Sequence, residues 1–244
     1  MPLHDWTKVN SGIFHHFHQG WCWELGHALN RNGVMPKNLA ALVEQKHGFK
    51  EPDVVAVELN LPDDNRSEYG DSGGTALLER PKTRVTRQTD DEHYAGKASR
   101  IVIRHRLGRI VAFIEIVSPG NKDGGPALRQ FVEKIAEALR NGIHVLVVDP
   151  FPPTPRDPDG IHKAIWDCLH VEDFELPARQ NRVLASYEGV GVFSAFIETV
   201  GVGDALPDMP LFIAPGAHVM VPLESSYMAT WAASPNAIHR LVEE

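Results

Sequence analysis

The chain has 244 residues, of which 43% are hydrophobic and 23% charged, and these values are ordinary for a folded globular protein. The formal charge of −8 excludes a protein whose whole surface binds nucleic acid, so any contact with a polyanion must come from a local basic patch. No apolar run reaches the roughly 18 residues of a membrane span, and polar residues interrupt the N-terminal segment. We therefore expect neither a membrane segment nor a signal peptide.

The cysteines and histidines give no sequence signature of a metal site. Cys22 and Cys168 are too few for a disulfide framework and favour two reduced, buried thiols in a cytoplasmic protein. Among the 13 histidines, the cluster at residues 15–18 places His15 and His18 on one helical face. No acid or third ligand at helical spacing accompanies them, so we interpret these histidines as surface or half-buried groups.

The first 59 residues predict one helix and two strands. Apolar residues recur at steps of three and four over residues 11–30, which is typical of an amphipathic helix, and Ser11 is its expected N-cap. Residues 39–45 read as a first strand. The β-branched run over residues 53–59 predicts a second strand, which begins at Asp53.

Residues 60–98 differ in composition from the segments on either side. They carry dense charge of both signs and several glycines, so we expect a surface excursion, with a short strand over residues 83–88. This segment also holds a local basic cluster, which could contact a nucleic-acid backbone, although a solvated loop is the simpler interpretation. The cluster consists of Arg80, Lys82, Arg84 and Arg87.

The segment that follows predicts a crossover unit. Two strand-like runs over residues 101–106 and 109–118 are joined by a tight turn, and they precede a helix that ends at residue 140. Residues 143–149 then form a buried strand, which we expect to run parallel to the strand before the helix. Further on we predict a Pro-rich connection at 150–158, a short helix at 161–169, strands at 183–187 and 193–200, and a last helix at 223–233.

This order predicts an α/β fold in a single domain spanning residues 1–244, with helices on the faces of one sheet. We expect its core to comprise residues 11–59 and 99–149. Residues 60–98 would be the surface excursion, and residues 150–244 a C-terminal extension with α+β additions packed on the core. A homodimer is compatible with the sequence, which leaves the oligomeric state open.

Two acidic residues lie where this order could form a site. Asp53 begins the second predicted strand, and Glu115 lies in the apolar strand directly before the crossover helix. A carboxylate among apolar strand residues is costly unless it pairs with a cation or binds a metal. Two carboxylates at the ends of neighbouring strands are oxygen ligands suited to Mg²⁺ or Mn²⁺, and such an ion could activate water against a phosphodiester.

Each acid also has a purely structural interpretation. Asp53 could be a turn residue at the entry to its strand. Glu115 could pair with Arg104 or Arg106 on the adjacent hairpin strand.

The order of elements resembles the PD-(D/E)XK, restriction-endonuclease-like superfamily, in which a Pro-Asp pair and an acidic strand precede the second core helix. Within that superfamily the chain resembles the bacterial domain-of-unknown-function family 4058 and, more distantly, the Uma-type endonucleases. The resemblance spans nearly the whole chain, and its most specific motif is the run SPGNK at residues 118–122. Other matching stretches are Phe17-His18, Ala28-Leu29-Asn30, Pro36, Val43-Glu44, Pro52-Asp53-Val54, Glu115-Ile116-Val117, Gly142-Ile143-His144, residues 205–210 and Val221-Pro222-Leu223.

The resemblance implies a restriction-endonuclease-like core and a divalent-metal-dependent nuclease. Asp53 and Glu115, together with the carbonyl of Ile116, would hold Mg²⁺ or Mn²⁺ and carry the catalysis.

The superfamily lysine should stand two residues after the glutamate, where this chain has Val117. Its role would pass to Lys122 in the following loop or to Lys134 in the crossover helix. We favour Lys134, because a helix holds a side chain more firmly than a Gly-rich loop does. Taken alone, both lysines are typical of solvated charges. If the lysine has been lost rather than moved, the chain is a non-catalytic binding or assembly protein on the same scaffold.

Overall fold

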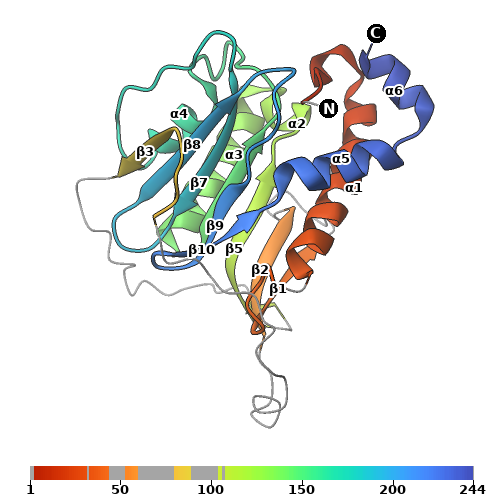
Figure 1. The fold of residues 1–244 in the computed structure, drawn as a ribbon. Coiled ribbons are helices and arrows are strands. Elements are labelled where there is room, and N and C mark those ends of the chain that lie inside the picture. Colours follow the sequence, from red (N-terminus) through yellow and green to blue (C-terminus); the bar gives the residue numbers. More distant parts are fainter. Residues whose placement is uncertain are drawn as a thin grey trace.

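The computed structural model describes residues 3–31, 33–43, 53–59, 80–88, 104–105 and 108–243. At its centre lies one eight-stranded sheet with helices on both faces (Figure 1). Its strands are β1 (Leu39–Val43), β2 (Val54–Leu59), β3 (Val85–Gln88), β4 (Arg104–His105), β5 (Gly108–Ile116), β6 (His144–Asp149), β7 (Arg182–Glu188) and β8 (Ser194–Val200). The described helices are the 3-10 helix η1 (Trp6–Lys8), α1 (Ser11–Asn30), α2 (Pro119–Lys122), α3 (Gly125–Arg140), α4 (Gly160–Trp166), α5 (Leu223–Ala233) and α6 (Asn236–Glu243).

The strand order across the sheet is β1-β2-β5-β6-β7-β8-β3, and β4 pairs with β5 beside this path. The pair β5 and β6 is parallel, while every other neighbouring pair in this order is antiparallel. Helix α3 connects the two parallel strands, as a parallel pair requires. The predicted α/β class and the predicted crossover between residues 109 and 149 are therefore confirmed.

Alternation along β5 assigns each side chain to one of two cores. Ile114 and Ile116 pack on the face covered by α1 and α5, and Phe113 and Val117 pack on the face covered by α3 and α4. A two-stranded hairpin of β9 (Met209–Ala214) and β10 (Ala217–Val221) lies on the α1 face (Figure 1). Burial on both faces explains why β5 and β6 read as nearly continuous apolar runs.

Helix α1 spans the predicted residues, although its cap differs by one position. Asn10, not Ser11, is the N-cap, and its Oδ1 accepts a hydrogen bond of 2.7 Å from the amide of Gly12. The helix packs against α5, where the indole N–H of Trp21 donates to the hydroxyl of Ser226 at 3.1 Å. This hydrogen bond ties the buried face of α1 to α5.

The C-terminal part is more closely integrated than expected. Residues 150–244 were predicted to be an extension packed on the core, but β7 and β8 extend the central sheet itself. The short strand expected at residues 83–88 is present as β3, which pairs with β8 at the sheet edge. Residues 60–79 and 89–98 of the predicted excursion lie outside the described residues. The hairpin β9–β10 and helix α6 were not predicted. In the described part of the chain, no helix is both long and apolar enough to cross a lipid bilayer.

Two buried histidines make the stability of the fold depend on pH. Burial lowers the pKa of His144 to about 4 and that of His162 to about 3. Both are therefore neutral in the folded chain at pH values where an unfolded histidine, with a pKa of 6.5, already binds a proton. Unfolding then takes up protons, so stability falls as the pH decreases from about 6.5 to about 4.

We expect His144 alone to lower the free energy of unfolding by roughly 3 kcal/mol as the pH decreases across this window, because each pKa unit corresponds to about 1.4 kcal/mol. Urea unfolding at a series of pH values measures it. The variant His144→Gln should show a shallower dependence on pH than the wild type, and an unchanged dependence would contradict the assignment.

Candidate functional site

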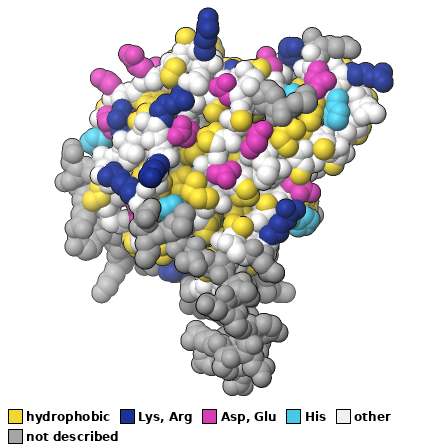
Figure 2. Space-filling view, viewed as in Figure 1, with side chains coloured by type: hydrophobic (Ala, Val, Ile, Leu, Met, Phe, Trp, Pro, Cys, Tyr) yellow, Lys and Arg dark blue, Asp and Glu magenta, His cyan; other side chains and the backbone are white. Residues whose placement is uncertain are grey.

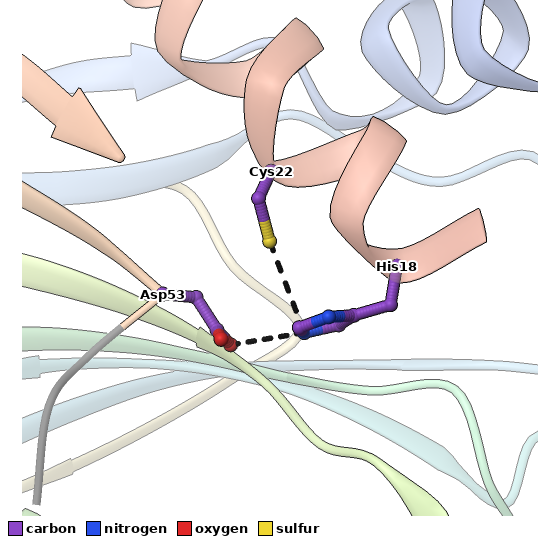
Figure 3. Close-up of side chains that lie close together, drawn as sticks. All are labelled: His18, Cys22 and Asp53. Atoms are coloured by element: carbon purple, nitrogen blue, oxygen red, sulfur yellow. Dashed lines mark hydrogen bonds and ion pairs between the residues drawn. The ribbon is translucent and has the colours of Figure 1, made fainter. Parts of the chain in front are cut away.

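Three potential metal ligands from distant parts of the chain converge at the start of β2 (Figure 3). Helix α1 presents His18 and Cys22 four residues apart, so both side chains lie on the helix face that packs against the sheet. Asp53 directly precedes β2. All three residues are buried, and their exposed fractions are 5%, 4% and 3%.

The ligand atoms of this cluster lie close together. Nε2 of His18 is 3.2 Å from Oδ2 of Asp53 and 3.8 Å from the Sγ of Cys22. All three atoms lie within 4.8 Å of one another. The backbone N–H of Ile116 donates to the same Oδ2 at 2.7 Å, which fixes the carboxylate of Asp53 at the end of β5.

This geometry is unlike that of a Cys-His-Asp catalytic triad. In a triad the nucleophile and the acid contact different nitrogens of the imidazole, so that the ring can relay a proton between them. Here Asp53 and Cys22 both approach Nε2 of His18. The second nitrogen, Nδ1, is buried and has no hydrogen-bond partner among the residues that the structure describes. Three donors that point at one place form a group that could hold a metal ion.

The donors around Asp53 do not fit the Mg²⁺ or Mn²⁺ ion expected from the sequence. That expectation required oxygen ligands from Asp53, Glu115 and the carbonyl of Ile116. Within the described ranges, the group that converges on Asp53 supplies a nitrogen and a sulfur instead, and it does not include Glu115. Hard ions such as Mg²⁺ and Mn²⁺ prefer oxygen ligands, so an imidazole and a thiol are poor partners for them.

Glu115 lies on the other face of the sheet and meets a cation there. The Nζ of Lys134, on α3, is 2.5 Å from Oε1 of Glu115, and both side chains are largely shielded from water. The expectation that a lysine nitrogen reaches one of the two acids is confirmed for Lys134. The interpretation of Lys134 as a solvated charge is wrong. Lys134 lies at the edge of the apolar face of α3, and when this face packs against the sheet the lysine side chain becomes largely buried.

In the described part of the chain, the two acids are contacted from different helices. Asp53 is engaged from the α1 side through His18, whereas Glu115 is engaged from the α3 side. The two acids nevertheless lie near one another along β5, because the amide that binds Asp53 belongs to the residue after Glu115. A single ion shared by both carboxylates stays a prediction. The alternative partner Arg106 and the side chain of Arg104 lie outside the described residues.

Lys122 is buried in a separate cluster, so its interpretation as a solvated charge is also wrong. Its Nζ lies 2.6 Å from Oδ2 of Asp149, at the end of β6, and 2.9 Å from Oδ2 of Asp157. Burial raises the pKa of Asp149 to about 6, although the ammonium group opposes this shift. In the described part of the chain, the charged partners of Lys122 are these two acids and not Asp53 or Glu115.

The SPGNK run accounts for this position of Lys122. Both the amide and the hydroxyl of Ser118 donate to Oδ1 of Asn121, at 2.8 and 2.9 Å, and this closes the short helix α2 directly after β5. The turn directs the next residue back toward the end of β6. The SPGNK run therefore places Lys122 beside the buried carboxylates of Asp149 and Asp157.

The local basic cluster is partly neutralised. Arg84 lies 3.8 Å from Glu198 and also donates to Gln180, and Arg87 lies 2.9 Å from Glu172. On the face drawn in Figure 2, Lys and Arg side chains lie among Asp and Glu side chains rather than in one basic area. These contacts lend no support to a phosphate-binding patch at this cluster.

Sequence reasoning missed His18 and Cys22 as a pair of ligands. The available signal was their spacing of four residues on one helix face, the same spacing that places two zinc ligands in the H-E-x-x-H motif. Cys22 was instead interpreted as a reduced, buried thiol. The second cysteine, Cys168, was expected to be buried but is exposed.

Comparisons of the chain with protein-family profiles, with curated proteins and with solved structures found no match.

Proposed function

We propose that the protein is a divalent-metal-dependent phosphodiesterase on a restriction-endonuclease-like scaffold, with nucleic acid as its substrate class. The observation that carries the proposal is the contact between Glu115 on β5 and Lys134 on α3. The resemblance implies an acid on that strand with a lysine beside it. The chain has Val117 where the lysine would normally stand, and a lysine from the crossover helix reaches the same acid.

The topology supports the scaffold. The order α1, β1, β2, β5, α3, β6 contains a helix, three antiparallel strands, a crossover helix and a parallel strand. This is the arrangement that the resemblance implies. Asp53 precedes the second of these strands and Glu115 lies near the end of the third, as the motif requires.

Lys134 would act by charge. A phosphodiester gains negative charge in its transition state, and a fixed cation in a water-poor site stabilises that charge. The carboxylate of Glu115 holds the ammonium group in place. The packing of α3 against the sheet limits the positions that the lysine can adopt.

A non-catalytic binding or assembly protein is the second candidate, and the burial of the site favours it. Glu115 and Asp53 are only 2% and 3% exposed, which leaves little surface for a substrate to contact. On this view the pair of Glu115 and Lys134 joins α3 to the sheet and has no chemical role.

The test is nucleic-acid cleavage by the purified protein. Single-stranded DNA, duplex DNA and RNA are incubated with Mg²⁺, Mn²⁺, Co²⁺ or Zn²⁺, and the products are separated by size. We expect cleavage, reduced about 100-fold or more by Glu115→Gln, because the substitution removes the charge that positions the cation. Glu137→Gln, at an exposed site on α3, the helix that carries Lys134, is the matched control.

Two results would contradict the proposal. An absence of cleavage with every metal and substrate favours the non-catalytic candidate. Cleavage that persists unchanged in Glu115→Gln would come from another site or from a contaminant.

A further inference from the structure

We infer that His18, Cys22 and Asp53 form a binding site for a borderline transition-metal ion of the Zn²⁺ class, distinct in chemistry from the oxygen-ligand site expected from the sequence. The inference does not rest on the proposed phosphodiesterase activity. It follows from the distances, the donor types and the way the three residues are held.

The distances between the three ligand atoms are close to those around a metal ion with tetrahedral coordination. Metal–ligand bonds of about 2.0–2.3 Å place neighbouring ligand atoms of a tetrahedron about 3.3–3.6 Å apart. The separation between Nε2 and Oδ2 is 3.2 Å and that between Nε2 and Sγ is 3.8 Å. The third separation, between Cys22 and Asp53, is at most 4.8 Å. Small rotations of the Cys22 and Asp53 side chains would therefore complete the site.

The donor types select the metal. A thiolate, an imidazole and a carboxylate are the three protein ligands that zinc uses, and Co²⁺ accepts the same ligands. Mg²⁺ and Ca²⁺ favour sites made of oxygen alone. The described residues supply three donors. A fourth position would be filled by water.

The protein scaffold already holds the donors. His18 and Cys22 are fixed by a 20-residue helix that packs along its length against the core. Asp53 is held by the amide of Ile116. Little ordering of side chains remains to oppose binding, because all three are buried before the metal arrives.

Without a metal ion, Nε2 of His18 cannot form good hydrogen bonds to both Asp53 and Cys22 at the same time. This nitrogen has one in-plane position, which carries either a proton or a lone pair. Oδ2 of Asp53 and the Sγ of Cys22 both approach it, so a proton there can be well directed toward only one of them. A metal ion between the three atoms would satisfy each of them at once.

The inference is tested by metal binding itself. The full chain is purified with a reductant, freed of metal, and titrated with Co²⁺ while absorption spectra are recorded. We expect one equivalent to bind, with visible bands of a tetrahedral ion and a thiolate-to-cobalt charge-transfer band. Zn²⁺ should displace the cobalt. Cys22→Ser should remove the charge-transfer band, and Cys168→Ser, which changes the exposed cysteine, should leave it intact.

Thermal unfolding gives a second measurement that does not depend on colour. A ligand that binds only the folded state raises the unfolding temperature. Zn²⁺ should raise it for the wild type, for Cys168→Ser and for Glu115→Gln, and it should have no effect on a folded Cys22→Ser or His18→Gln variant.

Failure to bind one equivalent of Co²⁺, or binding that survives in Cys22→Ser with the same spectrum, would overturn the inference. Retention of metal by Glu115→Gln together with lost cleavage would separate this site from the proposed activity. Metal binding without any cleavage would support this site and contradict the phosphodiesterase proposal.

Discussion

Replacing Lys122 with methionine is expected to destabilise the protein by about 3–5 kcal/mol, the usual effect of removing one partner from a buried ion pair. The methionine fills a similar volume but leaves Asp149 and Asp157 buried without their cation. The cost should be smaller at pH 5 than at pH 7.5. Burial already raises the pKa of Asp149, so at low pH its carboxyl becomes neutral and no longer needs a partner.

Urea unfolding of the wild type and the variant at both pH values measures this effect. Lys163→Met is the matched control, because Lys163 pairs with Asp167 at a more exposed position on α4, four residues away. Such pairs contribute about 0.3–0.5 kcal/mol. Adding Asp149→Asn to Lys122→Met should recover part of the lost stability. A loss no larger than that of Lys163→Met would show that the buried cluster is not essential.

Replacing Lys134 with methionine is expected to reduce phosphodiester cleavage by about 100- to 1000-fold, which is typical for the loss of one fixed charge-stabilising group. The stability change should be smaller than that caused by Lys122→Met, because the side chain of Lys134 keeps 15% of its surface exposed. Lys134→Arg preserves the charge but changes its shape and reach, so we expect it to retain more activity than Lys134→Met.

Initial rates of cleavage at saturating metal measure this effect, and Lys163→Met again serves as the control. If Glu115 and Lys134 act as one unit, the double variant Glu115→Gln with Lys134→Met should lose no more activity than the worse single variant. Full activity in Lys134→Met would remove this lysine from the site, and the pair would then be structural.

Lys134 and Lys122 show when the burial of a charged side chain can be predicted from its position in the sequence and when it cannot. Lys134 lies at the margin of the apolar face of a regular helix, so helical periodicity alone indicated that it could reach the sheet. Lys122 follows a strand within a short Gly-containing segment, for which no periodicity exists. Its burial depends on the hydrogen bonds of Ser118 with Asn121 and on acids that lie 27 and 35 residues further along the chain.

Element prediction succeeded where the signal was local. Helices α1 and α3 and strands β5 and β6 have regular patterns of apolar residues over at least one full element, and each was expected within a few residues of its observed bounds. The β9–β10 hairpin was missed, since its short strands are stabilised by packing on the α1 face of the sheet. Propensity could not choose between Asn10 and Ser11 as the cap of α1, because both residue types cap helices well.

The amino-acid sequence by itself determined the α/β class, the crossover unit and the burial of Glu115 in an apolar strand, because each follows from the pattern of neighbouring residues. Only the tertiary structure decided which groups meet. It placed Asp53 beside His18 and Cys22, which lie more than 30 residues earlier in the chain. This contact depends on how α1 packs on the sheet, and the pattern of apolar residues along one segment does not specify which residues of another segment it will meet.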